Sequence, residues 1–504
     1  MSKHYITATD LYNFKKCAYR PFMDFNGDLS LKVDVHPLVK LLWESGVQYE
    51  AKVIESYQRD HSEKSFRAID PEKPASEALA KETLKAMQDG IDIIYQGVLI
   101  SGNKLGRPDL LLKTPGSSSL GAHHYYPMDI KLTRIDATWD DGNEKVPIEQ
   151  FWQIYFYGEL LEHVQGKRPE KGYIYKTKSR ILPIPLYKAP KNYEWSVNQL
   201  ENYLQGNAFG AEPTINSNCG LCDWKDSCRS WADEKQDISL VYYVGQAMKL
   251  GLNQLGIRSI EDLAAQDPDY LTRKVIELKN QGFFWNAMPA DLPAKSVVRA
   301  KIHLSKKPVI HNPITFPDAE KEIHYDIEDD PTQDFVYLHG ALLIEKGKEP
   351  KYYAFFAEHR DEERTITEHL FDFFNQHPDA TVYHYSDYEK TTLKRLISKH
   401  QLDSTSYERL FGKNGTAIDL YKIVTENTDW PLTSYGVKAI CKFLGFQWDA
   451  SDAGGAASIV WMNEYLSGHT SMKEKILRYN EDDCRATSFL KNELIKMQNH
   501  TNDV

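Results

Sequence analysis

The 504-residue sequence has only six cysteines and no long apolar run. A disulfide framework for so long a chain would need many more cysteines, so the class of disulfide-stabilised secreted domains is excluded. A membrane-spanning helix needs roughly 20 consecutive apolar residues, and no stretch approaches that length. The segment from Met1 to Leu11 lacks the basic start and apolar centre of a secretory signal. These absences predict a cytoplasmic protein with no membrane partner.

Low-complexity tracts, internal repeats and Gly-rich phosphate loops are also missing. Hydrophobic residues at 41%, aromatic residues at 12% and charged residues at 26% are typical of a folded globular chain. At about 150 residues per domain, the length predicts about three folded units. Because no phosphate loop of the Gly-x-x-x-x-Gly-Lys-Ser/Thr type is present, any helicase that works with this protein would be a separate chain.

An excess of basic residues is missing as well. The formal net charge of -11 argues against a protein that binds polyanions with its whole surface. It does not exclude cleavage of nucleic acid, because enzymes that hydrolyse phosphodiesters use carboxylates to hold cations. Two segments are locally basic and would be either nucleic-acid contacts or solvated surface: Lys167, Arg168, Lys171, Lys176, Lys178 and Arg180 in the first, and Lys295, Arg299, Lys301, Lys306 and Lys307 in the second.

The pattern of apolar residues predicts an α/β chain in three parts. Residues 1–235 form a first domain, residues 236–318 a helical connector with a basic linker, and residues 319–504 a mixed-sheet domain. In the first domain we expect a helix that begins near Thr7, where Thr7 and Asp10 have the spacing of a capping box, and further helices over 38–57, 79–87 and 148–164. Strands are expected near 97–100, 108–112, 125–132, 172–175 and 180–186. A turn at Gly102 and Asn103 joins the first two strands, and a hairpin loop over 116–121 joins the second and third. The last domain opens with a meander of strands over 323–328, 335–345 and 351–357.

A first candidate site lies on two strands of the first domain. Asp109 follows Gly106-Arg107-Pro108 at the start of one strand, and Asp129-Ile130-Lys131 ends another. Side chains alternate along a strand, so Asp129 and Lys131 share a face. Two carboxylates suit Mg²⁺ or Mn²⁺, which lowers the pKa of a bound water, and Lys131 would orient that water or stabilise the charge that develops on phosphorus.

Helices on either side of these strands carry further candidates. Glu50 lies on an early helix and is a possible additional metal ligand. Gln153 and Tyr157 are one helical turn apart on a later, aromatic helix, as expected for a pair that reaches toward a site or a nucleic-acid strand. The alternative for this pair is ordinary helix packing.

Four of the six cysteines form a second pattern. Cys219, Cys222 and Cys228 lie within ten residues, and Cys17, near the end of the first helix, is the candidate for a fourth ligand. The sequence has neither a second Cys-x-x-Cys pair nor a nearby histidine, which are the usual further ligands of zinc. A four-thiolate site suits an iron-sulfur cluster at least as well as zinc, and would fasten the first helix to the end of the domain.

In this order, the motifs at Cys17, Asp109, Asp129 to Lys131, Gln153 to Tyr157 and Cys219 to Cys228 resemble one branch of the RecB-like PD-(D/E)XK nucleases. That branch carries a 4Fe-4S cluster and includes AddB and the CRISPR-associated exonucleases. The resemblance implies a restriction-endonuclease-like fold over residues 1–235. It also implies Asp109, Asp129 and Lys131 as the catalytic core, with Gln153 and Tyr157 as the family's helix motif. The family often has a histidine ligand on the early helix, where this sequence has Gly46 to Glu50.

The C-terminal domain contains a third pattern of carboxylates. Asp326 and Glu328 share a face of its first strand, and Tyr479 and Asp483 lie one turn apart on a late helix. Acidic ligands for two cations and a tyrosine that positions water are what a two-metal exonuclease requires. Glu389 or Asp387, at a strand-to-helix junction, would supply another ligand, and Asp419 is either a ligand or a helix N-cap.

This third pattern resembles the tyrosine-bearing DEDD exonucleases of the RNase H-like superfamily over about residues 320–495. Asp326 and Glu328 match the first motif of that family, and Tyr479 and Asp483 match the third. The middle motif has Tyr388-Glu389 where the family has an aromatic residue and Asp. The longer Glu side chain moves the carboxylate by about 1.5 Å, and a misplacement of that size can slow a reaction strongly.

Together these patterns predict a metal-dependent nuclease with two hydrolytic sites, which cleaves DNA in preference to RNA and acts as an exonuclease on single-stranded ends. Its expected cofactors are Mg²⁺ or Mn²⁺ and a 4Fe-4S cluster, and its expected partners are nucleic acid and a separate helicase or other DNA-processing protein. The alternative is a nucleic-acid-binding scaffold in which one nuclease domain, the C-terminal one in particular, is inactive.

Overall fold

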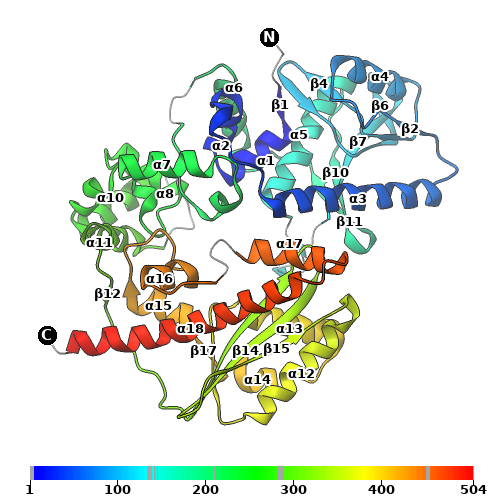
Figure 1. Cartoon of the computed structure of the whole chain (residues 1–504). Helices are drawn as coiled ribbons and strands as arrows, with labels where there is room; N and C mark the ends of the chain where they lie inside the picture. Colours follow the sequence, from blue (N-terminus) through cyan, green and yellow to red (C-terminus); the bar gives the residue numbers. More distant parts are fainter. Residues whose placement is uncertain are drawn as a thin grey trace. The chain divides into compact units, whose positions relative to one another are not determined.

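The computed structural model describes residues 5–132, 139–140, 143–144, 146–207, 211–280, 289–449 and 454–502. The chain divides into two compact units, Met1–Cys228 and Arg229–Val504, and each combines helices with a mixed sheet (Figure 1). The predicted α/β fold class is confirmed. Among the helices that the structure describes, none has both the length and the apolar character needed to cross a membrane.

The first unit is built on a six-stranded sheet. Its strands run in the order β11 (Arg180–Pro185), β10 (Lys171–Lys176), β7 (Gly121–Ile130), β6 (Leu110–Ser118), β3 (Ile93–Tyr95) and β2 (Phe66–Ala68). Strands β7 and β10 are parallel, as are β2 and β3, and the other neighbours are antiparallel. The predicted hairpin between residues 116 and 121 joins β6 to β7.

Helices cover both faces of this sheet because its strands are apolar on both sides. Leu110 and Leu112 of β6 pack with Val53 of helix α3 (Pro37–Asp60), whereas Leu111 between them packs in the core that includes helix α5 (Ile148–Gln165). The remaining helices of the unit are α1 (Ala8–Lys16), α2 (Tyr19–Asn26), α4 (Glu77–Gln88), α6 (Tyr193–Leu204) and α7 (Lys225–Lys235), the last of which continues into the second unit. Helix α1 begins with the predicted Thr7–Asp10 capping box.

One predicted connection in the first unit is wrong. The turn at Gly102 and Asn103 joins β4 (Leu99–Ser101) to a short strand, β5 (Lys104–Gly106), and not to β6. Strand β5 pairs with β1 (Ile6–Thr7) in a separate three-stranded sheet. A Cβ at Gly106 would lie 2.6 Å from Leu160 Cδ1 and 2.8 Å from Tyr157 Cδ1, so the missing side chain lets β5 pack directly on α5.

The second unit contains a five-stranded sheet in the order β15 (Lys351–Phe356), β14 (Phe335–Glu345), β13 (Lys321–Asp330), β16 (Thr381–His384) and β17 (Ile418–Asp419). The first three strands are antiparallel, as the predicted opening meander requires, and β16 and β17 run parallel to β13. A bulge between Glu328 and Asp329 interrupts the pairing of β13 with β14.

Alternation along β13 separates an apolar face from an acidic one. Ile323, Tyr325 and Ile327 pack with helices α12 (Glu363–Gln376), α13 (Tyr388–His400) and α14 (Thr405–Phe411). The opposite face, which carries Asp326 and Glu328, is covered by helices α17 (Gly455–Leu466) and α18 (Met472–Asn502) (Figure 1). The further helices of this unit are α8 (Gln246–Gln254), α9 (Ile260–Ala264), α10 (Pro268–Asn280), α11 (Leu292–Ser305), α15 (Leu420–Asn427) and α16 (Val437–Phe443).

The helical segment predicted as a connector belongs to the same compact unit as this sheet. A buried ion pair joins this segment to Asp429, further along the chain. Arg299 of α11 donates to Asp429, with 2.7 Å between Nε and Oδ1. His311 Nε2 lies 2.8 Å from the other oxygen of Asp429. The guanidinium of Arg299 also lies 5.0 Å from the ring of Tyr242, which stacks on Tyr435 at 3.7 Å.

This ion pair corrects the expectation for the second basic segment. Arg299 is only 6% exposed, so it is a structural residue and not a contact for nucleic acid. Lys301, Lys306 and Lys307 of the same segment are exposed, and Lys295 is exposed beside Asp291. In the first basic segment, Lys176 is buried, and the side chain of Lys178 lies outside the described residues. The basic surface is therefore smaller than the sequence suggested.

The replacement Arg299→Met should destabilise the second unit by about 3 kcal/mol, because it leaves the buried Asp429 carboxylate without its cationic partner. Urea denaturation followed by circular dichroism measures the change. The matched control is Arg364→Met, which removes the exposed pair between Arg364 and Glu368 and should cost less than about 0.5 kcal/mol. Equal effects of the two replacements would contradict the structural role of Arg299.

Candidate functional site

Three carboxylates meet on the acidic face of the second sheet. Asp326 and Glu328 project from β13, and Asp483 projects from α18. Each offers an oxygen within 4.8 Å of the oxygens of the other two, and no other set of three His, Cys, Asp or Glu residues in the described part of the chain is as close. Glu328 and Asp483 are buried and Asp326 is half-buried. The structure thus brings together three of the residues predicted for this site.

Close contact between α18 and the sheet holds Asp326 and Asp483 together. A Cβ at Gly340 of β14 would lie only 1.6 Å from Asn480 Oδ1, so only glycine leaves room for the Asn480 side chain. Asn480 then donates from Nδ2 to Asp326 Oδ2 at 2.7 Å and accepts from the Tyr352 hydroxyl at 2.7 Å. Asn480 therefore fixes how closely α18 packs on the sheet and how the Asp326 carboxylate is oriented.

Donors from α16 and the loop after it surround Asp483. Trp448 Nε1 donates to Asp483 Oδ1 at 2.7 Å. Lys438 Nζ lies 4.0 Å from the same oxygen and donates to the Tyr479 hydroxyl at 2.6 Å. The charge of Asp483 also acts on the Tyr479 hydroxyl and raises its pKa, after the larger effect of burial. The predicted tyrosine thus lies within the site, beside Lys438 and Asp483.

Burial and mutual repulsion change the acidity of all three carboxyl groups. Burial raises the pKa of Asp326 well above its usual range, and the charges of Asp483 and Glu328 raise it further. Burial and then the charge of Asp483 raise the pKa of Glu328 to about 8, although Ser458 and the charge of Lys438 oppose this change. Burial also raises the pKa of Asp483, although Lys438 and Trp448 oppose this change. Without a cation, the cluster therefore holds protons near neutral pH.

Glu389, the predicted middle ligand, lies outside the three-carboxylate group. Its buried carboxylate has Oε2 3.7 Å from His384 Nδ1, which is longer than a hydrogen bond, and this oxygen has no hydrogen-bond partner. Its charge still raises the pKa of Asp326. Asp387 and Asp419 are also outside the group. Asp419 accepts from the backbone N–H groups of Tyr421 and Lys422, which is the N-cap role considered for it from the sequence.

The donor set of the cluster fits a hard divalent cation. Carboxylate oxygens are the ligands that Mg²⁺ and Mn²⁺ prefer, and a cation would relieve the repulsion that keeps protons on Asp326 and Glu328. The group is small and buried, which favours one defined position for such an ion. The site therefore provides the ligands of a metal centre.

The candidate site of the first unit also assembles its central residues. Because β6 and β7 pair at Leu110 and Met128, Asp109 and Asp129 lie side by side at the end of these strands. The backbone N–H of Ile130 donates to Asp109 Oδ2 at 2.6 Å, and Lys131 Nζ lies 2.9 Å from Asp129 Oδ2. Asp129 and Lys131 therefore share a face, as the strand pattern indicated.

Glu50 reaches this site through a residue that the sequence did not reveal. Gln96 Nε2 donates to Glu50 Oε1 at 2.6 Å and to Asp109 Oδ1 at 3.1 Å. The backbone of Gln96 has a φ of 54°, a left-handed conformation that turns the chain at the end of β3. Because the Gln96 amide lies between the two carboxylates, Glu50, Asp109 and Asp129 do not form a group as close as that of the second unit.

Electrostatic interactions connect Tyr157 and Lys131 to these carboxylates. Burial raises the pKa of Asp109 well above its usual range, and Asp129 raises it further. Burial lowers the pKa of Lys131, but the charges of Asp129, Asp109 and Glu50 outweigh burial and raise it overall. The same three carboxylates raise the pKa of the buried Tyr157 hydroxyl, after the larger effect of burial. Gln153 lies one turn away on α5 and is half-buried.

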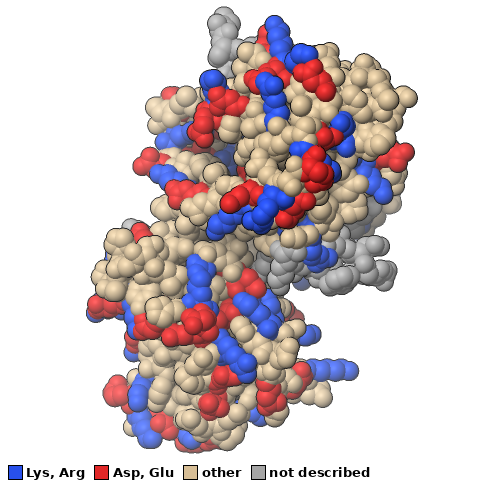
Figure 2. Space-filling model, turned by 90° about the vertical axis from the view of Figure 1, so that its right-hand side faces the viewer, with Lys and Arg blue, Asp and Glu red and all other residues tan. Residues whose placement is uncertain are grey.

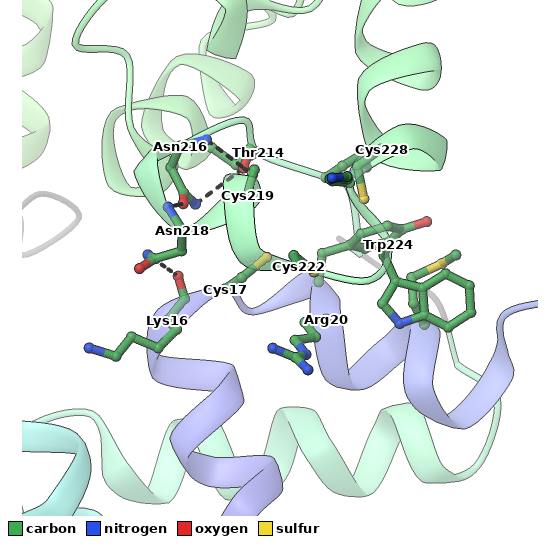
Figure 3. A pocket seen from close by; sticks show the side chains of 14 residues that line it. Lys16, Cys17, Arg20, Thr214, Asn216, Asn218, Cys219, Cys222, Trp224 and Cys228 are labelled. Atoms are coloured by element: carbon green, nitrogen blue, oxygen red, sulfur yellow. Dashed lines mark hydrogen bonds between the residues drawn. The ribbon is translucent and has the colours of Figure 1, made fainter. Parts of the chain in front are cut away.

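The four predicted cysteines line a single pocket of the first unit (Figure 3). Cys17 caps α1, Cys219 and Cys222 lie in and after the turn Ser217–Leu221, and Cys228 lies on α7. All four thiols are free. Burial and, to a smaller extent, the other three sulfurs raise the pKa of Cys228 to about 12. Cysteines from the beginning and the end of the first unit therefore line one pocket.

The four sulfur atoms do not form a close group, since no three of them lie within 4.8 Å of one another. Four thiolates at about 2.3 Å from one Zn²⁺ would lie about 3.8 Å apart in a tetrahedron. A cluster of several metal ions holds its thiolates further apart, because each thiolate binds a different ion.

On the face that Figure 2 shows, charged residues do not form one broad basic area. On the face drawn in Figure 2, Lys and Arg alternate with Asp and Glu. This agrees with the net charge of -11 and confines any contact with a polyanion to local groups of lysine and arginine.

Sequence patterns missed the residues that orient the carboxylates: Gln96 in the first site, and Ser458, Lys438, Trp448 and Asn480 in the second. Asn480 follows Tyr479 directly in the predicted helix motif, so its position was a usable signal. The other four have no fixed spacing from the acidic motifs, and only folding brings them into the sites.

Residues 323–495 match the family model RNase_H_2, of the RNase H superfamily. Together with the sheet order and the acidic cluster, this match shows that the C-terminal part of the chain is an RNase H-like domain with a nuclease-type fold. Among curated proteins, none matches the chain.

In metal-free buffer, the stability of the second unit should fall as the pH rises from about 5 to about 8. Glu328 has a pKa of about 8 in the folded chain and its usual 4.5 after unfolding, so the folded state binds the proton more tightly in this range. Glu328→Gln should reduce this fall, as measured by thermal melting in chelator at several pH values.

The matched control is Glu345→Gln at the end of β14. The Lys348 side chain lowers the pKa of Glu345, so this residue does not titrate in the same range. The control should keep the pH dependence of the parent. An unchanged pH dependence in Glu328→Gln would contradict the raised pKa of Glu328.

Proposed function

We propose that the chain is a metal-dependent nuclease with two hydrolytic sites, acting as an exonuclease on single-stranded DNA ends. The observation that carries this proposal is the cluster of Asp326, Glu328 and Asp483 beside Tyr479 within the RNase H-like domain. Buried carboxylates that repel one another are costly unless they bind a cation. A cation site beside a tyrosine hydroxyl is suited to phosphodiester hydrolysis.

In the second site the residues of the chain divide the work of hydrolysis. Asp326, Glu328 and Asp483 would hold Mg²⁺ or Mn²⁺, which supplies an acidic water and positive charge at the scissile phosphate. Tyr479, fixed between Lys438 and Asp483, would orient the attacking water through its hydroxyl. Asn480 and Trp448 keep two of the carboxylates in place by donating to oxygens that would otherwise rotate.

In the first site, the proposed RecB-like centre, Asp109 and Asp129 would hold the cation, with Glu50 as a further ligand once the Gln96 amide moves aside. The Lys131 ammonium stays charged beside Asp129 and would stabilise the negative charge that develops on phosphorus. The charges of these carboxylates act on Tyr157 of α5, and Gln153 lies one turn away on the same helix. This arrangement supports the predicted nuclease motif.

The cysteine pocket would hold a 4Fe-4S cluster as a structural element. Its support is the arrangement of the four thiols around one pocket. Cys17 and Cys228 belong to opposite ends of the first unit, so a cluster would tie its first helix to its last. We place the protein in the reducing cytoplasm, where such thiols persist, with a helicase or other DNA-processing protein as partner.

A nucleic-acid-binding scaffold is the second candidate, and the position of Glu389 favours it for the C-terminal domain. Glu389 lies near His384 and apart from the three grouped carboxylates. If this domain only binds, it should retain single-stranded DNA in Mn²⁺ without cleaving it.

Single-site replacements should separate the two activities. Asp326→Asn should lower the rate of cleavage by the second site at least about 100-fold. Lys131→Met should lower the rate of cleavage by the first site to the same extent. Each replacement removes a charged group at the reacting phosphate. End-labelled and circular DNA and RNA, incubated with Mg²⁺ or Mn²⁺, distinguish exonuclease from endonuclease action and DNA from RNA.

Lys113→Met is the matched control for the first site. It removes an ion pair with Asp92, 2.5 Å long, on the same sheet but away from Asp109, and should leave cleavage unchanged. If the double variant Asp326→Asn/Lys131→Met degrades DNA as fast as the parent, both site assignments are wrong.

Cys17→Ser should remove the cluster and lower the melting temperature of the first unit, because the early helix loses its covalent tie to α7. Protein purified without oxygen should be brown, with broad visible absorption, and the variant should be colourless. Cys441→Ala, at a buried cysteine outside the pocket, should keep the colour. A colourless parent with stoichiometric zinc would overturn the cluster.

A further inference from the structure

We propose that Lys438 is a positioning residue of the second site, which holds the Tyr479 hydroxyl in place and competes with the divalent cation for the carboxylates. The inference rests on the metal-dependent hydrolysis proposed above. It assigns a role to a residue that none of the acidic motifs contains.

Two contacts of Lys438 are made with Tyr479. Its Nζ donates to the Tyr479 hydroxyl at 2.6 Å and lies 4.0 Å from the centre of the same ring. Because the hydroxyl oxygen accepts from Lys438, its own hydrogen must point away from the ammonium. Without the ammonium, the hydroxyl would lose the donor that selects this orientation.

The ammonium also lies in the field of all three carboxylates. Its Nζ is 4.0 Å from Asp483 Oδ1, and its charge acts on Asp326 and Glu328 as well. A divalent cation among these carboxylates would be repelled by a positive charge at such short distance. Lys438 therefore stabilises the cluster before a cation binds and weakens the binding of the cation.

The fourth predicted carboxylate acts on the cluster from outside the close group. Glu389 Oε2 lies 3.7 Å from His384 Nδ1, and the charge of Glu389 still acts on Asp326. Within the close group, three carboxylates and one ammonium leave a smaller net negative charge for cations than four carboxylates would. Removing the charge of Lys438 therefore changes the charge of the close group directly.

The test compares full-length Lys438→Met, Lys438→Arg, Tyr479→Phe and the double variant Lys438→Met/Tyr479→Phe. All carry Asp129→Asn, which removes cation binding at the first site. Mn²⁺ dissociation constants come from the electron paramagnetic resonance of free Mn²⁺, and kcat and KM from end-labelled single-stranded DNA. Thermal melting verifies that each variant is folded.

We expect Lys438→Met to bind Mn²⁺ about tenfold more tightly, because a positive charge next to the ion is lost. Its kcat should fall by about 10- to 100-fold, with KM within about twofold of the parent, because the water-orienting hydroxyl is misplaced. Lys438→Arg should keep the parent's Mn²⁺ affinity and recover part of kcat. The double variant should be no slower than Tyr479→Phe, since both replacements act through one hydroxyl.

Unchanged Mn²⁺ affinity in Lys438→Met would overturn the proposal, as would losses of kcat that multiply in the double variant. A parent that binds Mn²⁺ but cleaves no nucleic acid would instead refute the proposed function. In that case tighter binding of Mn²⁺ by Lys438→Met would still support the competition between Lys438 and the cation.

Discussion

Carboxylates held within 4.8 Å of one another in a buried place repel strongly, because little water remains to screen them. Neighbouring donors and one positive charge reduce this repulsion among Asp326, Glu328 and Asp483. These neighbours are Asn480, Trp448, Ser458 and Lys438. These donors come from helices α16, α17 and α18 and the loop after α16. The packing of those helices on the sheet is therefore tied to the same three side chains that would bind a cation.

The site of the first unit meets the same constraint differently. The Gln96 amide lies between Glu50 and Asp109, and the Lys131 ammonium pairs with Asp129. Amide and ammonium donors thus keep these carboxylates apart, whereas those of the second unit remain close together. Both sites combine acidic groups with one lysine. Of the two, only the second has three carboxylates close enough together to bind one ion.

Buried charge also determines how the second unit is assembled. Arg299 and Asp429 fasten the predicted connector to the RNase H-like domain, and the guanidinium lies near the stacked rings of Tyr242 and Tyr435. An arginine that looked like part of a basic surface is instead a fixed internal contact. The lysines that remain exposed nearby are the local groups through which an acidic protein can still approach a polyanion.

Local patterns in the sequence were sufficient to predict the α/β fold, the main strands and the Thr7 capping box. They also predicted that Asp129 and Lys131 share one face of a strand, and that Asp326 and Glu328 share one face of another. Each of these depends on residues a few positions apart, whose geometry follows from the period of a strand or helix. Only the tertiary structure showed that β5 turns away into a second sheet, that Glu389 stays outside the cluster, and that Gln96, Lys438 and Asn480 enter the sites. Those facts depend on side chains distant in the sequence, which meet only when the helices pack on their sheets, closely so at Gly106 and Gly340.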